Sequence, residues 1–130
     1  MRTIAKRTVQ GFAAAALALG GIAATAGTAS ANTDTYCQHG TCITGTNTYN
    51  SWGQYGTVEI CNHQSSANDF VIWIKDDASG NTIASATTPL LYPGDCFSHG
   101  GYTTGSGDAI QVFARSGSLW SYGTDPIYPS

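Results

Sequence analysis

The most reactive side chains in this sequence belong to four cysteines and three histidines. The cysteines are Cys37, Cys42, Cys61 and Cys96, and the histidines are His39, His63 and His99. Zinc binds both kinds of side chain, and a site here would combine Cys37, His39 and Cys42 with His63. The spacing of these residues matches no common zinc site. We therefore predict no metal and no other cofactor, and we expect the cysteines to form two disulfides.

Four cysteines allow three disulfide pairings. We favour Cys37–Cys42 with Cys61–Cys96, and the main alternative is Cys42–Cys61 with Cys37–Cys96. Each bridge is expected to contribute about 2–4 kcal/mol to the free energy of unfolding. Disulfides persist in oxidising compartments, so either pairing favours an extracellular protein.

Side chains suited to catalysis are otherwise scarce. The adjacent carboxylates Asp76 and Asp77 resemble an acid pair or a calcium ligand set, but the spacing of a calcium-binding loop is absent. We predict instead that they cap a turn with Gly80 and Asn81. All three histidines lie in segments rich in glycine or serine, where surface loops are expected. We predict no catalytic residue, and thus a protein that is not an enzyme.

The N-terminal segment has the organisation of a secretion signal. Three basic residues precede an apolar run over residues 11–26, and Ala29-Ser30-Ala31 then gives the pattern that signal peptidase cleaves. We predict a signal peptide over residues 1–31 and a single domain over residues 32–130, secreted from the cell.

The charge of residues 32–130 restricts the partners of the mature protein. Two basic residues, Lys75 and Arg115, stand against eight acidic residues, so the formal charge is −6. Nucleic acids and anionic membranes are bound through clustered lysine and arginine, and neither is expected as a partner. We expect another secreted protein or a polysaccharide.

Apolar and polar residues alternate along this domain, as they do in β-strands. Strands are predicted at residues 57–61, 69–75, 82–86, 96–98, 108–115 and 119–122. Residues 69–75 are apolar on both faces, which predicts a central strand with Trp73 in the core. The glycine-rich residues 98–107 are predicted as a loop. Six or seven short strands predict a single small antiparallel β-sandwich of the all-β class, with an immunoglobulin-like architecture.

Aromatic residues gather in the polar segment 43–56, which is predicted as a loop. Small polar residues and glycines surround its three large rings there. Rigid rings beside small polar groups are typical of recognition surfaces. We predict a binding surface that consists of Tyr49, Trp52, Gln54, Tyr55 and Tyr102. Trp120 and Tyr122 would extend this surface, and the alternative for Trp52 is that it fills one end of the core.

The same segment resembles the loop that tendamistat-type α-amylase inhibitors, small secreted bacterial β-sandwiches, present to their target. The resemblance spans about residues 42–116 and includes Tyr49-Asn50-Ser51-Trp52, Tyr55, Asp76-Asp77, Pro93-Gly94, Gly101-Tyr102 and Ala114-Arg115. It implies a tendamistat-like sandwich and inhibition of a glycosidase. The family's arginine between the tryptophan and the tyrosine is absent here, and with it a charge-assisted contact to catalytic carboxylates. The family's second disulfide has no counterpart near Ser116, whereas Cys37 and Cys96 are additional.

Three non-catalytic functions fit these observations. The first is a hydrolase inhibitor, in particular of a glycosidase, that inserts the aromatic loop into the cleft of its target. The second is an adaptor or structural subunit of a secreted assembly, such as a toxin or a cell-surface complex. The third is a carbohydrate-binding module whose aromatic rings stack on sugars.

Overall fold

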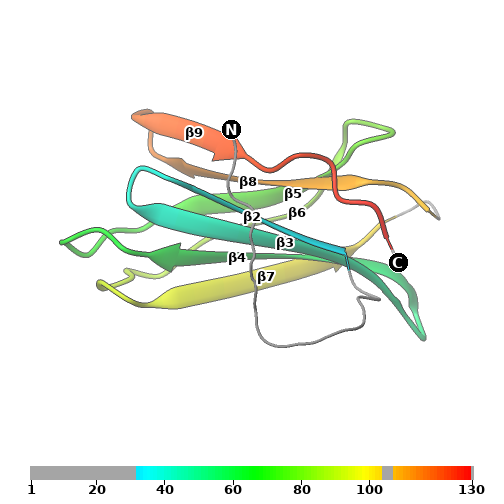
Figure 1. Cartoon of the computed structure of the whole chain (residues 1–130), viewed down its shortest axis with the longest axis horizontal. Coiled ribbons are helices and arrows are strands. Elements are labelled where there is room, and N and C mark those ends of the chain that lie inside the picture. Colours follow the sequence, from blue (N-terminus) through cyan, green and yellow to red (C-terminus); the bar gives the residue numbers. More distant parts are fainter. Residues whose placement is uncertain (1–31, 104–106, 130) are drawn as a thin grey trace.

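The computed structural model describes residues 32–103 and 107–129, and the predicted signal peptide lies outside this range. The described chain folds into two antiparallel sheets of four strands each, packed face to face (Figure 1). The first sheet has the order β2-β3-β4-β7 and consists of β2 (Asn32–Gln38), β3 (Thr41–Asn50), β4 (Gly53–Asn62) and β7 (Cys96–Tyr102). The second has the order β6-β5-β8-β9 and consists of β6 (Thr82–Thr87), β5 (Val71–Asp76), β8 (Ile110–Ser116) and β9 (Trp120–Gly123).

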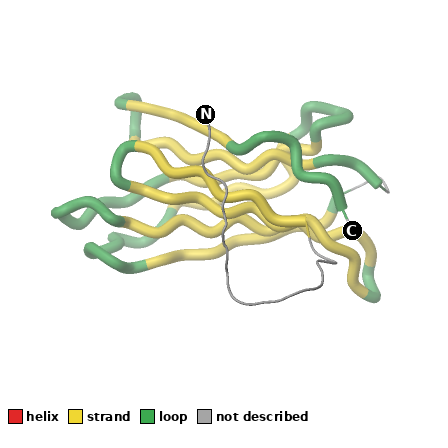
Figure 2. Tube along the Cα trace, in the orientation of Figure 1, coloured by secondary structure: helices red, strands yellow, loops and turns green. Residues whose placement is uncertain are grey.

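The predicted all-β sandwich is therefore confirmed. Figure 2 shows strands joined by loops throughout the described residues. In the same residues there is no helix with the length and apolar character that a membrane span requires.

The core lies between the two sheets and is built from alternate positions of the strands. Ile72 and Ile74 of β5 are fully buried, as is Phe70 just before it. The same face of the second sheet contributes Ile110, Val112 and Ala114 from β8. β5 pairs with β6 on one side and β8 on the other, so the prediction of a central strand is confirmed.

The prediction that Trp73 lies in the core is wrong. Its position on β5 alternates with the buried isoleucines, so its side chain lies on the outer face of the second sheet. There it is half-buried and stacks on Phe113 of β8, with 5.3 Å between the ring centroids. A cross-strand aromatic pair on the outer face therefore accounts for the apolar residues on both sides of β5.

Two segments that were predicted as loops form strands. Residues 43–56 make up most of the β3–β4 hairpin, and β7 extends through the glycine-rich segment to Tyr102. His99 consequently lies on a strand. The residues before Cys37 also form a strand, β2, so that eight strands are described where six or seven were expected.

Both favoured disulfides are present, Cys37–Cys42 and Cys61–Cys96. Each joins residues that face each other on neighbouring strands. In the alternative pairing, Cys37 would have to reach Cys96 across three strand spacings, or about 14 Å. A disulfide tolerates a Cα–Cα distance of roughly 7 Å at most, so the sheet excludes that pairing. The bridges are consistent with folding in an oxidising compartment.

The turn at Asp76-Asp77 is also as predicted. The N–H of Ala78 donates to Oδ1 of Asp76 over 2.9 Å, and the N–H of Gly80 donates to its carbonyl oxygen over 2.8 Å. Gly80 has a φ of 75°, which glycine adopts at little cost. Asp76 therefore holds the β5–β6 turn through its side chain and its backbone.

Candidate binding surface

The end of the β3–β4 hairpin projects beyond the strands beside it. Within residues 32–103 and 107–129, the pairing of β2 with β3 reaches Asn47 and the pairing of β7 with β4 reaches Tyr55. Residues 49–53, here called the hairpin tip, extend past both neighbours and are seen at the lower right of Figure 1. The tip carries no charged side chain.

Trp52 occupies the turn of this tip, and 84% of its surface is exposed. Its N–H donates to Oδ1 of Asn50 over 2.7 Å, and Nδ2 of Asn50 donates to the hydroxyl of Tyr102 over 3.0 Å. Gly53, which follows, has a φ of 133°, a conformation that favours glycine. The indole is therefore displayed on a turn that is already ordered. This position excludes the alternative in which Trp52 fills the core.

Tyr55 and Tyr102 lie together on the outer face of the first sheet. Their rings meet edge to face with centroids 4.7 Å apart. The ring of Tyr55 covers Gly100 of the neighbouring strand, because a Cβ on Gly100 would collide with the Tyr55 ring and hydroxyl. The hydroxyl end of the Tyr55 ring thus lies over Gly100 on the outer face of the sheet.

Tyr49 lies on the other side of the hairpin from Tyr55. It pairs with Gln54, whose side chain is directed inward, and its hydroxyl lies near Gly107. Its side chain is 46% exposed. The aromatic residues predicted as one surface are therefore divided: Trp52 stands at the tip, Tyr55 and Tyr102 lie on the outer face, and Tyr49 lies on the inner side.

Gln54 does not belong to the exposed surface, because β4 directs its side chain between the sheets, where it is 3% exposed. Its Nε2 donates to Oδ1 of Asn47 over 2.9 Å and to the carbonyl oxygen of Asp108 over 2.6 Å. Its Oε1 accepts a hydrogen bond from the N–H of Gly107 over 2.8 Å. Gln54 thus fastens the base of the tip to the segment between β7 and β8, which is a structural role.

We expect Gln54→Leu to lower the free energy of unfolding by about 2–4 kcal/mol, because it leaves Oδ1 of the buried Asn47 without this partner and also removes the hydrogen bond from the N–H of Gly107. Urea unfolding monitored by tryptophan fluorescence measures the change. Gln38→Leu is the matched control, since Gln38 is exposed and its side chain makes one hydrogen bond, to Tyr36. Equal losses for the two variants would contradict the anchoring role.

Asp108 lies in the same segment, and its carboxyl group is next to that of Asp76. A side-chain hydrogen bond with Asp76 raises the pKa of Asp108 above its usual value, with smaller contributions from desolvation and from charge repulsion by Asp76. As the pH rises, the carboxyl group of Asp108 therefore keeps its proton to a higher pH in the native state than in the unfolded chain. The stabilisation from this proton is present below the usual aspartate pKa and is lost as the pH rises through the raised pKa.

Asp108→Asn replaces this proton with an amide N–H that does not titrate. We expect the variant to gain stability relative to the natural chain as the pH increases from about 3 to about 7. Urea unfolding of both proteins across this range measures the effect. Parallel stability curves would contradict the raised pKa of Asp108.

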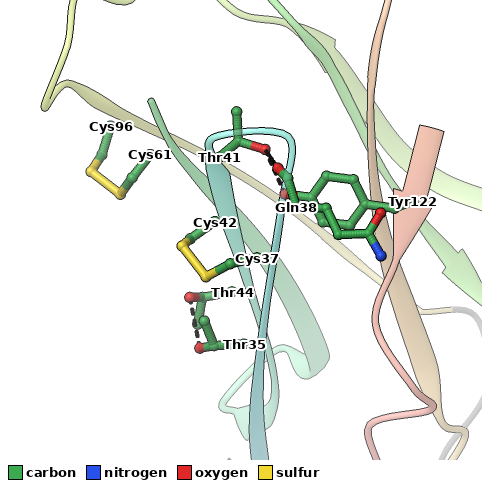
Figure 3. Close-up of a disulfide and its surroundings, with 9 residues drawn as sticks. All are labelled: Thr35, Cys37, Gln38, Thr41, Cys42, Thr44, Cys61, Cys96 and Tyr122. Carbon is green, nitrogen blue, oxygen red and sulfur yellow. Dashed lines mark hydrogen bonds between the residues drawn. A yellow bond between two sulfur atoms is a disulfide. The ribbon is translucent and has the colours of Figure 1, made fainter. Parts of the chain in front are cut away.

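The expectation that Trp120 and Tyr122 extend the binding surface is wrong. Both lie at the opposite end of the sandwich, where the hydroxyl of Tyr122 is 2.6 Å from Oγ1 of Thr41, the first residue of β3 (Figure 3). Tyr122 is buried, and this burial raises its pKa. Trp120 stacks on His39 with 4.8 Å between ring centroids. These rings therefore pack against the β2–β3 turn, away from the hairpin tip.

One group of metal-ligand types comes together in the described residues. Atoms of Glu59, Cys61 and Cys96 lie within 4.8 Å of one another. The two sulfurs are joined in a disulfide, whereas a metal binds the thiolate form of cysteine. The intact bridge therefore offers no metal ligand from these two residues.

The candidate surface consists of the exposed indole of Trp52, the Tyr55–Tyr102 pair behind it and the flanking ring of Tyr49. A comparison of the chain with protein-family models, with curated proteins and with solved structures finds no match.

Proposed function

We propose that this chain is a secreted, non-catalytic binding protein that inserts the hairpin tip into a cleft of another macromolecule, and that its target is a glycosidase. The observation that carries the proposal is Trp52, a large apolar side chain exposed on a projecting turn. Tryptophan is among the residues that contribute most to binding when a partner buries them.

The order of the tip supports this proposal. Hydrogen bonds from Trp52 to Asn50 and from Asn50 to Tyr102 fix the turn before any partner arrives. Binding then costs less conformational entropy than it would for a disordered loop. A narrow hairpin end is also convex, so its natural complement is a concave site such as the substrate cleft of a hydrolase.

The chemistry of the tip favours a cleft that binds sugars. The tip offers two aromatic side chains, an amide group and hydroxyls without any charge, and sugar-binding clefts contain aromatic and hydrogen-bonding groups that match these. This chain lacks the arginine that tendamistat-type inhibitors have between their tryptophan and tyrosine, so it cannot form that ion pair with the catalytic carboxylates of the target. Inhibition would therefore act by blocking the cleft.

Titration of the purified protein against α-amylases and other secreted glycosidases tests this function. We expect competitive inhibition, with an inhibition constant that is micromolar or lower. Loss of inhibition on addition of a long oligosaccharide substrate would place the tip in the substrate cleft. Absence of inhibition across the panel at micromolar protein would reject the glycosidase target.

A second function, binding of a neutral polysaccharide, is supported by the ring of Tyr55. The hydroxyl end of this ring lies over Gly100 on the outer face of the sheet, which also carries Thr46, Thr48 and Thr57. Flat rings flanked by hydroxyl groups suit stacking on a sugar chain. Retention on chitin, cellulose, starch or peptidoglycan tests this function, and elution in the void of all four columns would remove it.

A third function, an adaptor in a secreted assembly, is supported by the edge of the first sheet. β2 is the edge strand of the first sheet among the described residues, and an edge strand is the kind of element that pairs with a strand of a partner. Size-exclusion chromatography of the protein from culture medium tests this function. Elution at the mass of a monomer from native medium would argue against it.

A further inference from the structure

The four cysteines form a single row across the first sheet. Cys37 faces Cys42, Cys42 faces Cys61, and Cys61 faces Cys96, each pair on neighbouring strands (Figure 3). Their side chains share the outer face, because the next residues along β3 and β4 are buried in the core. The two residues at the ends of the row, Cys37 and Cys96, are exposed.

The central pair of this row is unbonded but well placed for a disulfide. The backbone of Asn62 bonds toward β7, since its N–H donates to the carbonyl oxygen of Asp95 over 2.9 Å and its carbonyl oxygen accepts from Gly94 over 2.6 Å. Backbone groups of successive residues point to opposite sides of a strand, so those of Cys61 point toward Cys42 on β3.

Cys42 and Cys61 are therefore a hydrogen-bonded pair, for which the Cα atoms are about 5.5 Å apart. This distance lies within the usual range of disulfides, roughly 4.4–6.8 Å. The two existing bridges occupy the closer, non-hydrogen-bonded pairs, with Cα–Cα distances of 4.0 Å. The Cα–Cα distance thus permits a bridge in the middle of the row, once the two Cβ atoms approach from the roughly 4.5–5.5 Å of a facing pair to the roughly 3.5–4.5 Å of a disulfide.

We propose that this row is a thiol–disulfide exchange site, at which a low-molecular-weight thiol attacks Cys37 and the exchange passes along the row to release Cys96. The attacking thiolate forms a mixed disulfide with Cys37, and Cys42 leaves as a thiolate. Cys42 then attacks Cys61, the Cys42–Cys61 bond forms, and Cys96 leaves and takes a proton from water. Two disulfides are present before and after, so no separate oxidant or reductant is needed.

Glu59 gives the exchange its direction. Its carboxylate lies within 4.8 Å of the sulfurs of Cys61 and Cys96, and Ser98 holds it through a hydrogen bond of 3.4 Å. An external thiolate that approaches Cys96 meets this negative charge, whereas the register places no acidic residue beside Cys37. The thiol therefore enters at Cys37, and the free thiol emerges at the opposite edge of the sheet.

Brief treatment of the full mature protein with glutathione tests the proposal, followed by alkylation and peptide mapping. We expect a species that carries glutathione on Cys37, a Cys42–Cys61 cross-link and an alkyl group on Cys96. Circular dichroism on the same sample shows whether the sheet is retained. If Cys37–Cys42 opens while Cys61–Cys96 stays intact, or if all four thiols appear together, the proposal is overturned.

Two variants distinguish exchange that passes along the row, here called the relay, from separate reduction of the two bridges. In Glu59→Gln all four sulfurs remain, but the carboxylate no longer repels the thiolate of Cys96 as it leaves Cys61. We therefore expect the alkylation of Cys96 to become about two- to fivefold faster. In Cys37→Ser/Cys42→Ser the relay is absent, and Cys96 should remain bridged over the same time. Release of Cys96 at the natural rate in the double variant, or an unchanged rate in Glu59→Gln, contradicts the proposed relay.

Discussion

Replacement of Trp52 by alanine is expected to weaken binding of the protein to its target by about 30- to 1,000-fold. This range corresponds to about 2–4 kcal/mol, the loss typical of a central aromatic residue in an interface. The indole is 84% exposed in the free protein and makes little contact with the core, so its removal should leave the melting temperature almost unchanged. Inhibition constants and thermal unfolding, measured on the same preparation, separate the two effects.

Leu119→Ala is the matched control for this experiment. Leu119 is 82% exposed, also in a hairpin turn, but that turn joins β8 to β9 at the opposite end of the sandwich. We expect this variant to bind as tightly as the natural chain. If both substitutions weaken binding equally, the partner does not recognise the hairpin tip. If only Leu119→Ala weakens it, the binding surface lies at the other end of the molecule.

The core strands were predictable because apolar residues recur at every second position along them. In β5 and β8, isoleucine, valine and alanine occupy every second position and are buried. Such a pattern has one interpretation, since a shift by one residue would expose the whole apolar set. The two disulfides lie in the first sheet, where each connects neighbouring strands at facing positions.

The hairpin was not predictable in the same way, because β3 buries polar residues. Its inward positions include Thr41, Gly45 and Asn47 beside a single large apolar residue, Ile43. Asn47 is fully buried because its Nδ2 donates to the carbonyl oxygens of Asp108 and Ile127. These partners lie about sixty and eighty positions further along the chain, so no local pattern indicates them. Composition alone therefore predicted a loop.

The candidate site was predicted only in part, because its residues also lie on the hairpin strands that were taken for a loop. The excess of aromatic residues correctly indicated an exposed Trp52, but period-two alternation in a hairpin assigns successive residues to opposite faces. Gln54 and Tyr55 are neighbours in sequence, yet one is buried and the other lies on the outer face. The assignment of Gln54 and Tyr55 to opposite faces can be predicted only if the segment is recognised as a strand. Because the segment was predicted as a loop, the two residues were placed on one surface.

Removal of the Cys61–Cys96 bridge is expected to have the largest effect on stability. The bridge closes a segment of 35 residues, and the loss of loop-closure entropy in the unfolded chain predicts a cost of about 4 kcal/mol for Cys61→Ala/Cys96→Ala. For a domain of this size, that cost lowers the melting temperature by about 15–30 °C. Thermal unfolding by circular dichroism measures the shift.

The bridge Cys37–Cys42 provides the internal comparison. It spans 5 residues and closes a β2–β3 turn that strand pairing already closes, so Cys37→Ala/Cys42→Ala should cost about 2 kcal/mol. Both bridges lie on the same sheet face, in the same kind of strand pair and with the same Cα–Cα distance of 4.0 Å. A difference between the double variants therefore reports loop length and little else. If the short bridge proves as stabilising as the long one, restriction of the unfolded chain is not the source of their effect, and contacts that the sulfurs make in the folded sheet must supply it.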